Sequence, residues 1–140
     1  MSRVVNTSSP GTLRAQMRRT IAELLRRLMF KPRLDDESQD MAATLVYCLR
    51  AINDSIETTV AAWEKRDYFL KADRFRLEWE WTGPAAKRLE ALIREGRWAA
   101  LPRELAELAP RFADIRIAKY TRSEAIWAGA CKRLLAEPPA

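Results

Sequence analysis

The feature that most constrains the fold is the stretch of residues 35–82, which contains neither glycine nor proline. Pro32 precedes this stretch, and Gly83 and Pro84 follow it directly. Glycine and proline are the residues that most often end helices, and apolar residues recur between them at helical spacing. The stretch therefore predicts either one very long helix or two nearly collinear helices. We expect an all-α fold, a helical bundle around this long central element with shorter C-terminal helices.

Two parts of the long stretch differ in their apolar pattern. Over residues 41–63 the apolar residues recur in steps of three and four, as on a helix that buries one face. Four charged residues at positions 64–67 interrupt this pattern. Over residues 68–81 the apolar residues fall on two opposite helix faces, so this segment needs cover on both sides. Residues 75–81 also alternate with period two, as in a strand, but no second strand candidate exists and a helix is favoured.

The length of 140 residues suits one domain. Polar and turn-forming residues at positions 1–11 predict a flexible arm, followed by a helical domain over residues 12–136 and a tail over residues 137–140. Thr12 is the expected N-cap of a first helix that packs antiparallel beside residues 41–63. Further helices are expected over residues 85–95 and 111–119 and after a capping box at residues 121–124, surrounding residues 68–81.

The two cysteines bear on the compartment. Cys48 and Cys131 lie within apolar helical patterns and lack the spacing of a disulfide framework or a metal site. We expect them to be reduced core residues of a cytoplasmic protein. The chain start lacks a hydrophobic signal-peptide core, and no run approaches the roughly 20 apolar residues that cross a bilayer. No membrane partner is therefore expected.

The net charge of +6 is concentrated near the N-terminus. Residues 1–34 hold eight basic residues and one acidic residue, a charge of +7, which leaves −1 for residues 35–140. Such asymmetry suggests an anionic partner, either a nucleic acid or an acidic protein. A solvated arginine face, or an acidic neighbour inside the same fold or oligomer, is the alternative. The candidate binding residues are Arg14, Arg18, Arg19, Arg26, Arg27, Lys31 and Arg33.

The doubly apolar segment at residues 68–81 is a second candidate surface. Exposed tryptophan and phenylalanine side chains on a monomer normally mark an interface. We therefore expect a homo-oligomer, unless the short C-terminal helices fold back over both faces. The expected interface residues are Leu70, Leu77, Trp79 and Trp81. Together, the two surfaces favour a non-enzymatic interaction or scaffold protein that needs no cofactor.

The chain contains no histidine, which excludes the Ser-His-Asp and Cys-His arrangements. An enzyme would have to rest on carboxylates. Glu37 and Asp40, followed by Glu64 and Asp67, resemble the E-x-x-E and E-x-x-D pairs of the MazG-like all-α nucleotide pyrophosphohydrolases. The resemblance covers roughly 30 residues, and Asp40 stands where that family has glutamate. It implies that these four acids hold Mg²⁺ against a nucleotide triphosphate.

The spacing of the two acidic pairs limits this alternative. On one continuous helix they would lie roughly 40 Å apart, at 1.5 Å per residue. They could then meet only across an oligomer interface. A chain reversal near residues 53–55 would bring them together, but it would cut the apolar pattern that runs through Ile52 and Ile56.

Overall fold

The computed structural model describes residues 9–139, in which it contains α-helices and short 3-10 helices but no strand. The α-helices are α1 (Pro10–Met29), α2 (Asp36–Lys65), α3 (Phe69–Trp79), α4 (Thr82–Arg94), α5 (Leu101–Leu108) and α6 (Ala130–Ala136). The 3-10 helices are η2 (Trp98–Ala100), η3 (Ala109–Phe112) and η4 (Glu124–Ile126). The all-α prediction is confirmed, including the preference for a helix over a strand after Phe75.

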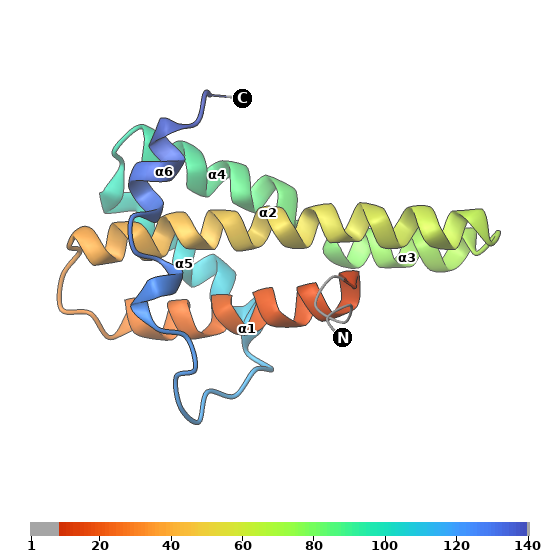
Figure 1. The fold of residues 1–140 in the computed structure, drawn as a ribbon, viewed down its shortest axis with the longest axis horizontal. Coiled ribbons are helices and arrows are strands. Elements are labelled where there is room, and N and C mark those ends of the chain that lie inside the picture. The colour runs from red at the N-terminus through yellow and green to blue at the C-terminus, as the bar shows by residue number, and fades with distance from the viewer. Residues whose placement is uncertain (1–8, 140) are drawn as a thin grey trace, which may run out of the picture.

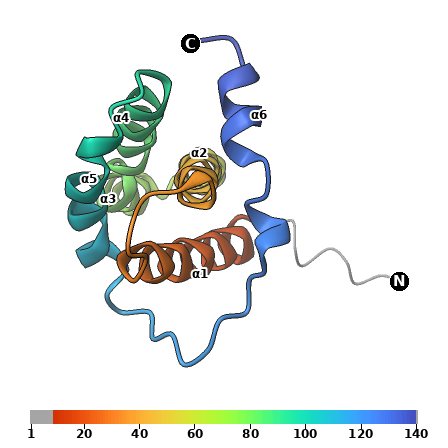
Figure 2. The same ribbon diagram turned by 90° about the vertical axis from the view of Figure 1, so that its left-hand side faces the viewer.

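Helix α2 is the centre of the bundle. In the end-on view of Figure 2, α1, α4 and α6 lie around it. Residues 41–46 are buried without interruption, which a helix achieves only when neighbours cover all of its sides. Helix α1 runs antiparallel beside α2, as predicted, with α4 on another side (Figure 1). The C-terminal helices thus surround the first part of α2, and the expectation that they surround residues 68–81 is wrong.

Helix α3 folds back along the end of α2, so the prediction of two collinear helices is wrong (Figure 1). The break falls at the charged residues 64–67, as expected, but it reverses the chain there. Asp67 adopts the left-handed conformation, with φ of 62°, that makes this reversal possible. The Phe75 ring then lies edge-on to Trp63, with 5.0 Å between ring centroids. Residues 60–79 form a hairpin that projects beyond the bundle, the α2–α3 hairpin.

Both ends of the described chain differ from the predicted boundaries. Ser9, rather than Thr12, caps α1 by accepting a hydrogen bond from the Thr12 N–H over 3.1 Å. Residues 10 and 11 therefore belong to α1 and not to an arm, and residues 1–8 lie outside the described part. Near the other end, Glu137 is half-buried and accepts a hydrogen bond from the Tyr47 hydroxyl over 2.7 Å. This residue is thus packed on α2 instead of belonging to a free tail.

The predicted helix over residues 111–119 is absent. Residues 113–123 instead form an irregular loop that crosses α1, visible as the blue segment beneath α1 in Figure 2. The last helix begins at Ala130, not directly after the predicted capping box. Cys48 and Cys131 are both free and buried, as predicted. Within residues 9–139, no helix combines the length and apolar character needed to cross a membrane.

Candidate anion-binding surface on α1 and the 113–123 loop

Several basic residues of α1 contact other parts of the chain. Arg14 donates to the Thr59 hydroxyl over 3.0 Å and lies 4.8 Å from the centroid of the Phe75 ring. Arg18 forms an ion pair with Asp114 at 2.7 Å. Arg14 therefore connects α1 to the α2–α3 hairpin, and Arg18 connects it to the 113–123 loop.

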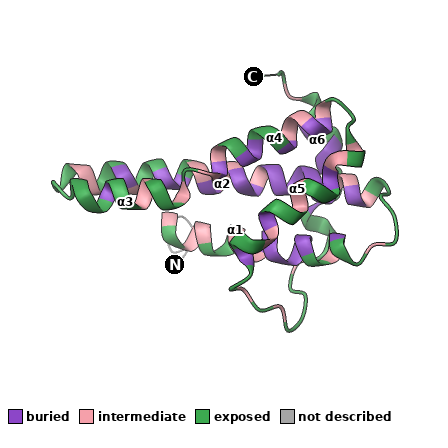
Figure 3. Ribbon diagram, turned by 180° about the vertical axis from the view of Figure 1, so that it is seen from behind, coloured by how far each residue is buried: buried purple, intermediate pink, exposed green. Residues whose placement is uncertain are grey.

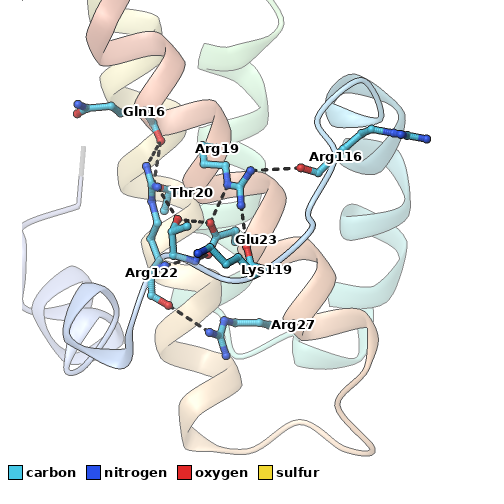
Figure 4. Close-up of polar contacts among 9 residues, drawn as sticks. Gln16, Arg19, Thr20, Glu23, Arg27, Arg116, Lys119 and Arg122 are labelled. Carbon is cyan, nitrogen blue, oxygen red and sulfur yellow. Dashed lines mark hydrogen bonds and ion pairs between the residues drawn. The ribbon is translucent and has the colours of Figure 1, made fainter.

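Glu23, the only acidic residue of α1, lies at the centre of this surface and is fully buried (Figure 4). It accepts hydrogen bonds from Arg19 Nε at 2.7 Å, from the Thr121 and Arg122 N–H groups at 2.9 Å each, and from the Thr121 hydroxyl. Burial alone raises the pKa of a carboxyl group, but these hydrogen bonds outweigh it and lower the pKa of Glu23 to about 2. Ionised Glu23 therefore holds the loop on α1.

Arginines of α1 also bind the backbone of the loop. Arg19 donates to the carbonyl oxygens of Arg116 at 3.2 Å and Lys119 at 2.8 Å. Arg27 donates to the carbonyl oxygen of Arg122 at 3.1 Å (Figure 4). These contacts, together with those of Glu23, hold residues 116–122 on α1 in a non-helical conformation.

Most of these contacts leave the positive charge of α1 in place. A carbonyl oxygen or an aromatic ring contacts a guanidinium group favourably without adding a negative charge. Arg27, for example, lies 3.9 Å from the Tyr120 ring centroid and 5.0 Å from that of Trp127, with no ion pair in the described chain. Within residues 9–139, Arg26 and Arg33 form no ion pair either. The surface therefore remains strongly basic.

The loop adds cations that the overall charge distribution concealed. Arg116, Lys119 and Arg122 lie within seven residues, and Asp114 is the only acid beside them in the 113–123 loop. The charges of residues 35–140 sum to −1, and this total hides the local excess of positive charge. A charge count over a window of about ten residues would have revealed it. Because the loop lies on α1, its cations extend the basic surface of that helix.

Two apolar hollows adjoin these basic residues. One, of about 450 Å³, lies where the α1–α2 connection meets α5, and the other, of about 460 Å³, lies between α1 and η3. Met29 lines both hollows, so we treat them together as the α1–α5 groove. Lys31 and Arg33 border the first hollow, and Arg26 and Arg116 border the second. Apolar lining residues include Leu28, Leu34, Leu101 and Leu105 in the first hollow and Leu25, Phe30, Phe112 and Ile117 in the second.

The first acidic pair of the enzyme alternative has structural contacts. Glu37 forms an ion pair with Lys31 at 2.9 Å and accepts a hydrogen bond from Trp127 Nε1 at 3.2 Å. The hydrogen bond from Lys31, opposed in part by burial, lowers the pKa of Glu37. Asp40 accepts hydrogen bonds from the N–H groups of Gly129 at 3.1 Å and Cys131 at 2.9 Å, at the start of α6. Both acids therefore help to attach the C-terminal segment to α2.

The second acidic pair lies at the far end of α2. Glu64 is 3.6 Å from Arg76, and Asp67 is in the turn of the hairpin. Because α2 is unbroken, the two pairs are separated by roughly 40 Å within one chain, and no reversal occurs near residues 53–55. Residues 9–139 contain no group of three or more histidine, cysteine, aspartate or glutamate side chains placed to hold a metal ion. A magnesium site made of both acidic pairs would need a second subunit.

The four predicted oligomer-interface residues divide into two kinds. Leu70 and Leu77 are exposed on the outer face of α3. Trp79 packs on Phe75, with 6.2 Å between ring centroids, and Trp81 lies edge-on to Phe112 at 5.9 Å. Each tryptophan is partly covered by its own chain, so the large exposed apolar side chains of α3 are the two leucines and Phe69, which is 55% exposed.

Comparisons with protein-family models, with curated proteins and with solved structures found no match for this chain. Its function must therefore be argued from the geometry and charge of its own residues.

Proposed function

We propose that this chain is a non-enzymatic interaction protein that binds an acidic, amphipathic segment of a partner protein in the α1–α5 groove. The observation that carries the proposal is the combination of an apolar groove with basic residues that have no ion pair within residues 9–139. Met29 and Phe30 are 67% and 72% exposed at this groove, which makes them available for contact. Arg26, Arg33 and Arg116 supply the neighbouring positive charges.

The apolar part of the groove favours a protein segment over a nucleic acid. A nucleic acid would use the cations to bind its phosphate groups. It would not account for the two hollows lined by leucine, isoleucine and phenylalanine. An amphipathic helix places apolar side chains at steps of three and four residues and can carry acids along both flanks. Its apolar face would fill the hollows, while its acids would meet the arginines and set its orientation.

A direct test uses a fluorescent helical peptide with leucine at helical spacing and glutamate on both flanks. Its binding is measured by fluorescence anisotropy, with a peptide of the same composition and scrambled order as the control. We expect the ordered peptide to bind and the scrambled peptide to bind at least tenfold more weakly, because only the ordered peptide has an apolar face. Equal binding of both peptides, or tighter binding of duplex DNA of similar length, would contradict the proposal.

Protein variants locate the binding site. The double variant Arg26→Glu with Arg33→Glu should weaken peptide binding at least tenfold, because acids would then face acids. The matched control is Lys87→Glu with Lys132→Glu, which changes the net charge equally at exposed positions of α4 and α6. Phe30→Ser should also weaken binding, since it removes exposed apolar surface without changing the charge. If the control pair weakens binding as much as the groove pair, the peptide is responding to net charge alone.

A further inference from the structure

We infer that the outer face of α3 pairs with the same face of a second copy, antiparallel, about a two-fold axis between Asp73 and Arg74. This surface lies on the α2–α3 hairpin, away from the α1–α5 groove. The inference is therefore independent of the acidic-partner proposal.

The outer face of α3 consists of two exposed leucines with two charged residues between them. Leu70 and Leu77 are 65% and 69% exposed, and they are two helical turns apart on one side of the helix. Ala72, on the opposite side, is fully buried against α2. Figure 3 shows the outer side of α3 largely in the colour of exposed residues. Asp73 and Arg74 occupy the turn between the leucines, and both are exposed.

This arrangement is complementary to itself when one helix is reversed. Position 70 then faces position 77 of the second copy, and Asp73 faces Arg74 of the second copy. A two-fold axis produces each contact twice, as in an isologous interface. Parallel pairing would instead place Asp73 beside Asp73 and Arg74 beside Arg74, which is repulsive. The charges therefore select the antiparallel arrangement.

The existing contacts of the two charged residues leave them able to pair across the axis. Arg74 forms no ion pair within residues 9–139, unlike its neighbour Arg76. Asp73 lies 3.2 Å from Arg76, but its side chain is 65% exposed and has a second carboxylate oxygen for another donor.

The charge of the hairpin also favours a second copy as the occupant. Residues 60–79 contain five basic and four acidic residues, so the hairpin has a net charge of only +1. A surface this close to neutral gives little long-range attraction to a nucleic acid or an acidic protein, and it repels a copy of itself only weakly. The occupant that matches both the leucines and the charges is therefore the same helix, reversed.

The size of this surface predicts a weak dimer. The 11 residues of α3 span roughly 16 Å at 1.5 Å per residue, which is short for an interface of about 800 Å² per partner. We expect a dissociation constant on the order of 100 μM, measurable by sedimentation velocity between about 10 μM and 1 mM. A chain that remains monomeric at 1 mM would overturn the inference.

Charge reversal tests the proposed pairing. Asp73→Arg places arginines against arginines and should weaken association at least tenfold. The double variant Asp73→Arg with Arg74→Asp should restore association, because the reversed charges are complementary again across the same axis. Both positions are exposed, so circular dichroism should show unchanged folding. Failure of the double variant to recover association, with folding intact, would overturn the pairing.

Disulfide trapping tests the register. The variants L70C and L77C are prepared separately and then mixed under mild oxidation. The mixture should cross-link, because these positions face each other, whereas each variant alone should not, because its copies lie roughly 10 Å apart along the helix. The native cysteines are buried, and burial raises the pKa of Cys48 to about 12, so they should not interfere. Cross-linking of either variant alone, without cross-linking in the mixture, would overturn the antiparallel register.

Discussion

The bundle and the α2–α3 hairpin share one helix but surround it differently. In the bundle, residues 41–46 of α2 are buried on every side by α1, α4 and α6. In the hairpin, α3 covers one side of α2, and the neighbouring Ala61 and Ala62 are exposed. One continuous helix thus serves as the buried core of the bundle and then as half of a projecting arm. The cover around the helix, more than its own sequence, decides which role each part has.

The contacts that hold the two regions also differ. The loop on the bundle is attached by a buried carboxylate and by arginine contacts to carbonyl oxygens. The hairpin is held by packing among Trp63, Phe75 and Trp79. Arg14 and Arg18 reach the rings of Phe75 and Trp79 from α1 and so link the regions. We therefore expect changes in the bundle to affect global stability and changes in the hairpin to act locally.

The largest effect should follow from a cavity in the bundle core. Leu45 is fully buried on α2, and Leu45→Ala should lower the free energy of unfolding by about 3 to 4 kcal/mol. Urea denaturation followed by circular dichroism measures this change. The matched pair Val46→Ala and Val60→Ala removes the same two methyl groups from buried positions of α2 in the bundle and at the base of the hairpin. Val60→Ala should cost about 1 kcal/mol less than Val46→Ala, because fewer elements surround Val60. Equal losses would remove the distinction between the regions.

Removing the Glu23 carboxylate should have the next largest effect. In Glu23→Gln the amide oxygen can still accept from the Thr121 and Arg122 N–H groups, but the NH2 group replaces the oxygen that accepts from Arg19 Nε and the Thr121 hydroxyl. This change should cost about 2 kcal/mol of unfolding free energy. The control is Asp114→Asn, which breaks the ion pair with Arg18 at a carboxylate that is 67% exposed. That change should cost less than about 1 kcal/mol. Similar losses for the two variants would show that Glu23 has no special role.

The pH dependence of folding stability tests the role of the ionised Glu23 carboxylate. The pKa of Glu23 is lowered from 4.5 to about 2 in the folded chain. Its contribution to stability is therefore complete above pH 4.5 and lost as the pH falls toward 2. The stability difference between the wild type and Glu23→Gln should be constant above pH 5 and should shrink below pH 4.5. A difference that is unchanged at pH 3 would contradict the assignment.

The contrast between the regions also explains what sequence patterns could and could not predict. Glycine and proline spacing predicted the all-α class, and apolar spacing predicted the central helix and its antiparallel neighbour. The break at residues 64–67 was visible as a run of charges. Its geometry was not, because the reversal depends on Asp67 adopting a left-handed conformation in which glycine is the residue usually found.

The basic surface was predicted only in part, because its other half is distant in sequence. The charge excess of α1 was evident, but the groups that engage Arg18, Arg19 and Arg27 lie more than 90 residues away. Local patterns favoured a helix at residues 111–119, but contacts from α1 hold residues 116–122 in a non-helical conformation. Glu23 was visible as the one acid of a basic segment, but nothing local shows that the loop supplies its donors.

A smaller effect, confined to the hairpin, should follow from weakening its aromatic cluster. Phe75→Leu removes the edge-on contact with Trp63 and the contact with the Arg14 guanidinium group. It should lower the free energy of local opening of α3 by about 1 kcal/mol. Native-state hydrogen exchange should show faster exchange for amides of α3 and unchanged exchange for residues 41–46 of α2. Equal acceleration in both regions would mean that the hairpin and the bundle unfold as one unit.

The smallest expected effect is a stabilising one, at the turn of the hairpin. Asp67 has φ of 62°, its side chain is exposed, and Asp67→Gly relieves the left-handed conformation at the cost of a more flexible unfolded chain. The net gain should be about 0.5 kcal/mol, seen as slower hydrogen exchange in α3. Gly96, with φ of 68° and no atom within 4 Å of an added Cβ, provides the converse change after α4. Gly96→Ala should destabilise the bundle by about 1 kcal/mol for the same conformational reason. If Asp67→Gly leaves exchange in α3 unchanged, the left-handed turn is not what limits the stability of the hairpin.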